Sequence, residues 1–483
     1  MQFNSWLFVV FFVGTLGITA ALKRTGFWLH WLLFASYAFY GWLNPLFLIL
    51  IGYSTVIVYF TGLAVDDGEN AVKSDKSPKS RKSRKVWLTV SILNSVFLLG
   101  FFKYAGFMTD NLNYILGVIG VAAEIPAPGF ILPVGISFYT FIGMSYVIDV
   151  YTGKIPSERN FVRLAVFVSF FPYLLAGPIE RAKNMLPQLS TPPRITADGI
   201  AEGSSLFLVG LFKKVALADF LALYVNRVYE NPSDFQGLTL LAATYAFTWQ
   251  IYFDFSGYTD MARGCARMLG FKLMLNFNNP YLSTGLGEFW QRWHISLSSW
   301  FRDYIYIPLG GNRRGRFGTY RNMVLTMLVA GLWHGAAWNF VIWGGLHALG
   351  RTVTRELERT RVYRERIPKF VKQLAVFHFV CLTWIFFRAE TFGDAVTVLG
   401  GILSVVKNAG ALQTLQTLQK NPGFPVVAIL LILAVWAYQF MYESKLKRIL
   451  EISFVRIGIA VAMILYLFFF RTSGYEVFYY FRF

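Results

Sequence analysis

Three of the five histidines lie in one stretch of the chain, Glu288 to His347. Among them, His334 stands in an apolar segment that reads Gly331-Leu332-Trp333-His334-Gly335. An ionisable side chain is costly at membrane depth, so it marks a candidate functional site. A buried imidazole stays neutral, and a neutral imidazole can accept a proton from a hydroxyl group. His334 is therefore a candidate general base that activates an alcohol for attack on an acyl group.

The same pattern also allows a structural role for His334. A core histidine that is hydrogen-bonded to a carbonyl of a neighbouring helix meets the cost of burial equally well. The small neighbours Gly331 and Gly335 suit the catalytic role, because they would let a substrate approach the ring. Residue types alone leave the two roles equally supported.

His294 is the second candidate, as a residue that assists His334. It follows Glu288, Arg292 and several tryptophans, which is typical of an interface helix on the cytoplasmic side. His294 and Ser298 are four residues apart, so on a helix they would share a face. The alternative is a surface histidine at the level of the lipid headgroups.

His347 is interpreted as structural. It follows His334 by thirteen residues within the apolar segment Met323–Leu349. If that segment is one continuous helix, the two histidines lie about 20 Å apart along its axis and on different faces. They would then be unable to serve the same atom.

Arginines near this stretch are candidates for binding the acyl donor. Arg313 and Arg314 follow Gly310-Gly311, and Arg302 lies shortly before them. A guanidinium group suits the phosphate of a phosphate-bearing donor, although arginines also collect in cytoplasmic loops for reasons of topology. No metal-ligand spacing, phosphate-binding glycine loop or Gly-x-Ser-x-Gly nucleophile motif occurs, so we expect neither a metal nor a serine nucleophile.

Composition places these residues in a membrane protein. The 483 residues are 55% hydrophobic, 18% aromatic and only 15% charged, whereas soluble domains carry about 25% charged residues. The net charge of +19 is explained by basic cytoplasmic loops, and no soluble basic domain is present to bind nucleic acid. Cys265 and Cys381 lie in or beside apolar stretches and suit buried small hydrophobic residues. We predict a single integral-membrane domain, residues 1–483.

Charged loops set the expected orientation. Residues 66–86 contain seven lysines and arginines and are predicted to be a cytoplasmic loop. Lys23 and Arg24 fall on the same side by alternation, which places the N-terminus outside. Trp6–Leu22 lacks a preceding basic region and is read as a retained first span, not a cleaved signal peptide.

Apolar length predicts about eleven transmembrane helices, with short, re-entrant and interfacial helices besides. The segment Leu206–Leu223 is interrupted by Lys213, Lys214 and Asp219, and we expect these lysines to snorkel to the interface. The other expected spans or partial spans are Trp6–Leu22, Phe27–Leu43, Leu46–Val65, Trp87–Phe107, Tyr114–Ala123, Ile131–Tyr151, Leu164–Ala176, Leu238–Tyr252, Met323–Leu349, Leu374–Phe387, Pro425–Phe440 and Ile452–Phe470.

Several long motifs resemble one known family. They are Phe289-Trp290-Gln291-Arg292-Trp293-His294-Ile295-Ser296-Leu297-Ser298, Trp300-Phe301-Arg302-Asp303-Tyr304-Ile305-Tyr306-Ile307-Pro308-Leu309-Gly310-Gly311, Leu332-Trp333-His334-Gly335, Leu132-Pro133-Val134-Gly135-Ile136-Ser137-Phe138-Tyr139-Thr140-Phe141, Leu174-Leu175-Ala176-Gly177-Pro178-Ile179 and Phe255-Ser256-Gly257-Tyr258-Thr259-Asp260. Together they resemble the membrane-bound O-acyltransferase (MBOAT) family over nearly the whole chain. The resemblance is to its bacterial branch of alginate O-acetylases and teichoic-acid D-alanyl transferases.

The resemblance implies a fold and two site residues. The expected fold is a ring of helices around a thin centre, with a funnel on one face and a tunnel to the other. His334 matches the family's catalytic histidine, and His294 matches the assisting histidine on the cytoplasmic approach. The expected donor is acetyl-CoA or another acyl thioester, with no bound cofactor.

Two features are similar to the acetylase side of the branch. The chain continues beyond Phe387-Arg388-Ala389-Glu390 into two further spans, and its aromatic tail, residues 471–483, ends like the acetylases. By this analogy Tyr480 is a candidate carrier of the acyl group. The alternative for the tail is an aromatic anchor at the membrane interface.

The predicted function is therefore an O-acetyltransferase of the bacterial inner membrane. It would move acetyl from a cytoplasmic thioester across the membrane to an exported polysaccharide, in contact with membrane lipid. The resemblance also implies a periplasmic or extracellular partner acetyltransferase of the serine-hydrolase type. The alternatives are D-alanyl or other acyl transfer from a carrier protein and, in another class, a secondary transporter, although no internal repeat favours transport.

Overall fold

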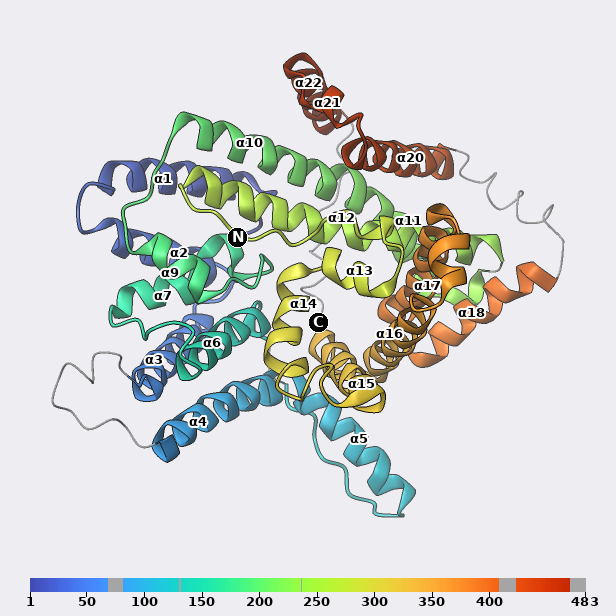
Figure 1. Ribbon diagram of the computed structural model, residues 1–483, viewed down its shortest axis with the longest axis horizontal. Helices are drawn as coiled ribbons and strands as arrows, with labels where there is room; N and C mark the ends of the chain where they lie inside the picture. Colours follow the sequence, from blue (N-terminus) through green and yellow to red (C-terminus); the bar gives the residue numbers. More distant parts are fainter. Residues whose placement is uncertain (68–80, 130–131, 236, 408–422, 470–483) are drawn as a thin grey trace. The chain divides into compact units, whose positions relative to one another are not determined.

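The computed structural model describes residues 1–67, 81–129, 132–235, 237–407 and 423–469, and every element among them is a helix (Figure 1). The prediction of an all-α protein is confirmed. The chain forms two compact units, one of Met1–Leu206 with Ala262–Met274 and the other of Phe207–Met261 with the residues from Leu275 onward. The prediction of a single integral domain over 1–483 stays a prediction.

The first unit contains the N-terminal helices. They are α1 (Trp6–Leu22), α2 (Trp28–Gly41), α3 (Phe47–Val65), α4 (Arg81–Leu99), η1 (Gly100–Tyr104), α5 (Ala105–Val118), α6 (Ile136–Tyr151), α7 (Phe161–Ser169), α8 (Phe171–Leu174) and α9 (Ala182–Leu189), with most of α10 (Ala197–Phe212) and the last residues of α12 (Leu238–Met268).

Two expected spans of this unit have different bounds in the structure. Tyr114–Ala123 is not a separate short element, because Tyr114–Val118 is the end of the continuous helical segment Arg81–Val118. The expected span Leu164–Ala176 is broken at Phe170, which has an extended ψ of 113° and separates α7 from α8. Pro172 in the first turn of α8 prevents α7 from continuing unbroken.

Arg84 ties three helix ends together beside the basic segment. Its guanidinium group donates to the carbonyl of Val65 at the end of α3 (2.8 Å) and to that of Tyr151 at the end of α6 (3.0 Å), and it pairs with Asp67. Of the predicted loop 66–86, the last residues from Arg81 belong to helix α4. Through these contacts Asp67 and Arg84, which stand near the two ends of the predicted loop 66–86, lie beside the C-terminal ends of α3 and α6.

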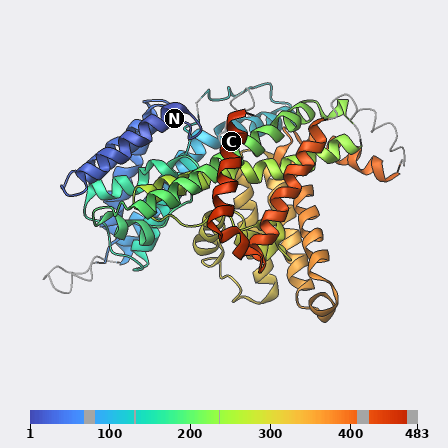
Figure 2. The ribbon, with the colours of Figure 1, turned by 90° about the horizontal axis from the view of Figure 1, so that it is seen from above.

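The second unit contains the remaining helices. They are η2 (Lys213–Ala218), α11 (Asp219–Glu230), η3 (Pro232–Asp234), most of α12, η4 (Pro280–Leu282), α13 (Leu286–Arg292), α14 (Ile295–Phe301), η5 (Arg302–Tyr306), α15 (Gly315–His334), α16 (Trp338–Leu357), η6 (Val362–Arg366), α17 (Lys369–Arg388), α18 (Phe392–Lys407), α20 (Gly423–Glu443), α21 (Lys447–Glu451) and α22 (Ser453–Phe469). Figure 2 shows α20 and α22 as two consecutive red helices joined through α21.

The apolar segment Met323–Leu349 is not one continuous helix. The chain breaks after His334, and α15 and α16 form a closely packed hairpin. A Cβ on Gly335 would overlap the ring of Phe340, and Cβ atoms on Gly331 and Gly344 would overlap the backbone of the opposite helix. The small residues around His334 therefore allow the two helices to approach, rather than leaving space for a substrate.

Lys214 does not snorkel to the interface. Its side chain is 6% exposed, and its ammonium group lies 2.8 Å from Asp219 and 2.7 Å from Asp254. Lys213 pairs with Asp260 at 2.8 Å. The prediction for Leu206–Leu223 is wrong for Lys214 because Asp254, a partner of this lysine, lies on another helix, α12.

The membrane assignment rests on apolar helices with apolar surfaces. Among the described residues, three helices are long and apolar enough to cross a membrane, and four shorter apolar helices accompany them. Large hydrophobic side chains are exposed on several helices, such as Phe34, Ile49, Phe97 and Phe468. The protein is a polytopic membrane protein, and the predicted count of about eleven spans stays a prediction. The two cysteines are free and buried, as predicted.

Candidate active site

His294 lies in a tight turn between two short helices. α13 ends at Arg292 and α14 begins at Ile295, and His294 itself has a left-handed conformation (φ 43°, ψ 54°) that non-glycine residues rarely adopt. Asn276 secures this turn. Its carbonyl oxygen Oδ1 accepts hydrogen bonds from the Ser296 backbone N–H (3.2 Å) and the Ser296 hydroxyl (3.0 Å), and it lies 3.0 Å from His294 Nδ1.

This arrangement assigns the tautomer of His294. The backbone N–H of Ser296 can only donate, so the atom of Asn276 that it meets is the oxygen. That oxygen accepts from His294 Nδ1–H, and the neutral ring then carries its lone pair on Nε2. Asn276 thus holds His294 in the tautomer whose Nε2 can accept a proton.

His294 is fully buried, so the alternative of a surface histidine at the headgroup level is wrong. Its ring packs against Phe255 (4.6 Å between ring centroids) and near Trp333 (6.1 Å). Burial lowers the pKa of His294 to about 3, which keeps the ring neutral at physiological pH. The expected helix face shared with Ser298 is also wrong, because the turn places His294 before α14 as its N-cap.

His334 is the last residue of α15, where the hairpin turns toward α16. Its side chain is 3% exposed and stands among aromatic rings: Trp333, Trp343 and Phe387 lie 5.0 to 5.2 Å away between ring centroids. Trp333 contacts the rings of both His334 and His294. The fold therefore brings both candidate histidines into ring contact with one tryptophan.

A cavity of about 430 Å³ in the second unit reaches His334. Its lining comes from α13, α14, η5, α15 and α16, and His294 is not among the lining residues. Apolar walls are supplied by residues such as Trp290, Phe301 and Met327. Polar groups are added by Gln291, Ser298, Ser299, Tyr306, Asn312 and Thr326.

Three arginines line the same cavity, Arg302, Arg351 and Arg355, and no carboxylate does. Arg302 is 63% exposed and pairs with Asp303, while Arg355 Nη1 donates to Asn312 Oδ1 at 3.1 Å. Arg351 lies against the backbone of Gly287, where an added Cβ would come within 2.6 Å of the guanidinium carbon. The cavity is thus lined by one exposed and two half-buried arginines and by a buried imidazole, which suits a long donor with an anionic end.

The structure separates the sequence-predicted residues into groups. His334 and Arg302 line the cavity. His294 does not line it, but its ring contacts Trp333, the residue next to His334. Arg313 and Arg314 are exposed and do not line it. Tyr480 and the tail 471–483 lie outside the described residues.

Arg351 and Arg355 were missed by the sequence reasoning. They stand four residues apart on α16, directly after the predicted apolar segment, which ends at Leu349. His347, Arg351 and Arg355 follow one another at intervals of four residues, so on a helix they share one face. This spacing could have predicted from the sequence that the two arginines lie together.

His347 is buried beside Trp343 and packs near Trp290, with ring centroids 4.7 and 5.0 Å away. Its Nε2 lies 3.0 Å from the hydroxyl of Thr383, which donates to the carbonyl of Val380. His347 Nε2–H therefore donates to Thr383. No group of three or more metal-ligating residues occurs in the described part of the chain.

Comparison with known proteins decides the family. Residues 152–390, which include His294 and His334, match the model of MBOAT, the membrane-bound O-acyltransferase family. The chain is 42% identical over 402 residues to the probable alginate O-acetylase AlgI of Azotobacter vinelandii, covering 83% of this chain and 76% of that protein. The chain belongs to the membrane-bound O-acyltransferase family.

Other relatives show the range of the family. The peptidoglycan O-acetyltransferase of Helicobacter pylori is 36% identical over 438 residues, covering 84% of this chain and 80% of that protein. The teichoic acid D-alanyltransferase of Bacillus subtilis is 28% identical over 281 residues, covering 55% and 71%. The protein described here is an O-acyltransferase, and the MBOAT resemblance found in its motifs is confirmed.

Proposed function

We propose that this O-acyltransferase moves an acetyl group from a cytoplasmic thioester, acetyl-CoA or another acyl thioester, across the membrane for O-acetylation of an exported polysaccharide. The observation that supports it most is the cavity that joins three arginines to His334. The acetyl group is favoured because relatives named as O-acetylases are 36% and 42% identical, against 28% for a D-alanyltransferase. A secondary transporter is set aside, because the family is one of acyltransferases.

His334 is proposed as the general base. A ring nitrogen takes the proton of the acceptor hydroxyl while the hydroxyl oxygen forms a bond to the acyl carbon. The carbon–sulfur bond of the thioester then breaks, and the imidazolium returns the proton to the leaving thiolate. The apolar and aromatic surroundings of His334 keep water away from the thioester.

His294 is proposed to assist on the donor side, in the tautomer that Asn276 sets. Asn276→Ala removes this hydrogen bond and the support of the left-handed turn, and we expect acyl transfer to fall about tenfold. Ser296→Ala is the matched control, since it removes one hydroxyl from the same cluster and leaves the bond between Asn276 and His294. The rate of acyl transfer in membranes measures both. Equal losses for the two variants would contradict the assigned role of Asn276.

The pKa of His294 gives a second, separate readout on stability. Its folded value, about 3, lies below the unfolded value of about 6.5, so the unfolded state binds the extra proton between these values. Stability should therefore decline as pH falls below about 6.5 and be unaffected by His294 above it. When the pH is lowered from about 6.5 toward 3, the melting temperature of His294→Gln should fall less than that of the parent protein.

Arg351 and Arg355 are proposed to hold the anionic end of the donor. Arg355→Gln or Arg351→Gln should raise KM for the thioester donor about tenfold with little change in kcat, because the contact is made equally in ground and transition states. Arg361→Gln is the control, since this arginine is 84% exposed, does not line the cavity and pairs with Glu365 four residues along its own segment. Steady-state kinetics with the donor varied give the result.

The same series tests the sequence-based candidates Arg313 and Arg314. If Arg313→Gln or Arg314→Gln raises KM and the two α16 variants do not, then the donor binds outside the cavity. The assignment of Arg351 and Arg355 would fall with that outcome.

The function itself is tested by supplying membranes with acetyl-CoA that is labelled in the acetyl group, and by recovering label from the polymer with mild base. Label in the polymer supports the proposal. Transfer only from a D-alanyl or other acyl carrier protein would replace it with the alternative acyl transfer.

We further propose an inner-membrane location with the N-terminus outside, which the contacts of Arg84 beside the basic segment support. We also propose a serine-hydrolase-type partner acetyltransferase outside the membrane.

A further inference from the structure

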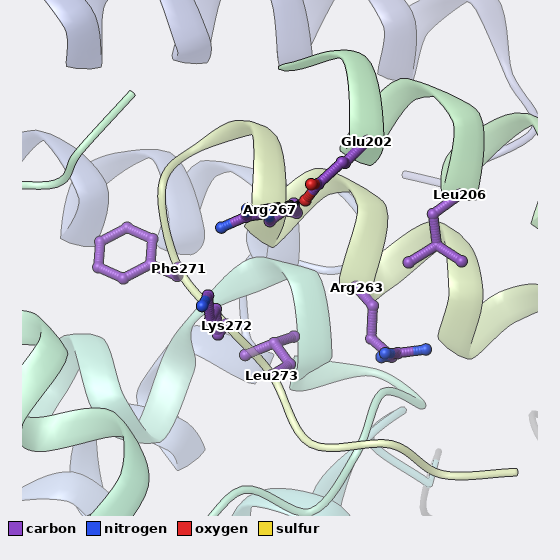
Figure 3. A pocket seen from close by; sticks show the side chains of 7 residues that line it. All are labelled: Glu202, Leu206, Arg263, Arg267, Phe271, Lys272 and Leu273. Atoms are coloured by element: carbon purple, nitrogen blue, oxygen red, sulfur yellow. Dashed lines mark hydrogen bonds and ion pairs between the residues drawn. The ribbon is translucent and has the colours of Figure 1, made fainter. Parts of the chain in front are cut away.

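A second cavity, of about 440 Å³, lies in the first unit between α10 and the end of α12 (Figure 3). Its lining residues are Glu202, Leu206, Arg263, Arg267, Phe271, Lys272 and Leu273. None of them belongs to the cavity of His334, and nothing in the proposed reaction uses them. Three of the seven are cationic and one is acidic, so the lining carries a net charge of about +2.

Two arginines of this cavity share one face of α12. Arg263 and Arg267 are one helical turn apart, and they are half-buried on a helix whose neighbouring residues are fully buried. Arg267 already has a partner, since its Nη2 lies 2.7 Å from Glu202 Oε2. Figure 3 shows Glu202 meeting Arg267, while Leu206 lies on the side of Arg263. The cavity thus has a polar side and an apolar side.

The cavity also lies where α10 changes from polar to apolar. The first part of the helix exposes Asp198, Glu202, Ser204 and Ser205, whereas the next four residues are Leu206, Phe207, Leu208 and Val209. Such a change marks the level at which a helix enters the membrane. Glu202 stands on the polar side of this level and Leu206 on the apolar side, both in the lining. The cationic groups are therefore at the depth of lipid headgroups.

The side of the membrane follows from the neighbouring charges. The connection from α8 to α10 carries Arg181, Lys183 and Arg194, and Lys272 follows the end of α12. Positive residues collect on the cytoplasmic side, where the leaflet surface is also negative because of anionic lipids. Guanidinium groups recognise phosphate through paired N–H donors.

We propose that this cavity binds the headgroup phosphate of an anionic phospholipid. Arg263 and Lys272 contact the phosphate together with Arg267, while Leu206 and Leu273 contact the first carbons of the acyl chains. Glu202 holds Arg267 in place and weakens the attraction for anions. The proposal is independent of which acyl group the enzyme transfers.

The test uses the purified full-length protein in detergent, titrated with short-chain phosphatidylglycerol while thermal unfolding is followed. Arg263→Gln and Arg267→Gln should each weaken the apparent affinity roughly three- to tenfold, the usual net contribution of one hydrogen bond. Glu202→Gln should strengthen it, because the net positive charge of the lining increases. If the Arg267–Glu202 pair were purely structural, both changes should alter the affinity for phosphatidylglycerol in the same direction. Opposite effects therefore indicate that the charge of the lining attracts the lipid.

Arg194→Gln is the matched control. Its side chain is exposed, its backbone packs against Gly270 beside the cavity, and it does not line the cavity. This variant should bind phosphatidylglycerol as the parent protein does. An equal loss for Arg194→Gln and Arg267→Gln would overturn the proposal, because binding would then follow total charge. If an arginine variant does not fold, Lys272→Gln replaces it, since Lys272 is exposed and should tolerate the change.

A final arm distinguishes the source of the phosphate. Glycerol 3-phosphate carries the same anionic group without acyl chains, and phosphatidylcholine carries the phosphate without net charge. Stabilisation by phosphatidylglycerol alone supports the lipid site. Equal stabilisation by glycerol 3-phosphate would assign the cavity to a soluble phosphate ester and overturn the lipid proposal, as would equal stabilisation by phosphatidylcholine.

Discussion

His334→Gln is expected to lower acyl transfer by about 10²- to 10⁴-fold, which is the usual contribution of a positioned general base. Glutamine has a similar volume to histidine and keeps hydrogen-bonding groups, but it cannot accept a proton at neutral pH. The hairpin should survive the change, because its packing depends on Gly331, Gly335 and Gly344. The measurement is the acyl content of the polymer at equal membrane levels of protein.

His347→Gln is the matched control for this prediction. Both histidines are buried and both pack against Trp343, but only His334 lines the cavity. The glutamine amide can replace the imidazole N–H that donates to Thr383, so we expect transfer within a few-fold of the parent protein. Equal losses in the two variants, with equal losses of protein from the membrane, would favour the structural role of His334 that the sequence left open.

Two of the N-terminal helices were predictable from the length of their apolar runs alone. Trp6–Leu22 has the same bounds in the structure as in the prediction, and Leu46–Val65 differs by one residue from α3. In these segments the apolar run, its flanking charges and the helix coincide, because each is set by the neighbouring residues themselves. The motif around His334 was equally visible, because its residues are adjacent in the chain.

What the sequence did not predict depends on residues far apart. The break after His334 contains neither proline nor charge, and the ring of Phe340 occupies the space that a Cβ on Gly335 would need. The left-handed turn at His294 depends on Asn276, which stands eighteen residues before it. Such turns are a tertiary effect, so helical periodicity placed His294 on a helix face where it does not lie.

Lys214 is the case in which the missing partner matters most. If only its own segment is considered, a lysine in an apolar helix is expected to extend its ammonium group to the membrane interface. Asp254, forty residues later on α12, offers a closer partner, and Asp219 a second one. Gly210 and Gly257 allow this approach, since an added Cβ on Gly257 would lie 2.7 Å from the Gly210 carbonyl.

Lys214→Met is therefore expected to be among the most damaging changes outside the site, with a loss of about 3–5 kcal/mol in the free energy of unfolding. The change leaves Asp219 and Asp254, each with a side chain no more than 5% exposed, without the ammonium group between them. Unfolding of the purified protein in detergent, followed by heat or denaturant, gives the value. Lys213→Met should cost about 1 kcal/mol or less, because the pair of Lys213 with Asp260 is partly exposed.

The decisive comparison adds Asp219→Asn and Asp254→Asn to Lys214→Met. If the cost arises from two uncompensated buried charges, neutralising them should restore most of the stability, although three polar contacts have then been changed. If the cost arises from lost packing of the lysine stem, the triple variant should be no better than the single one. A Lys214→Met variant that is as stable as Lys213→Met would mean that water reaches the carboxylates and that the cluster is not buried. The rescue thus distinguishes an electrostatic link between η2, α11 and α12 from simple side-chain packing.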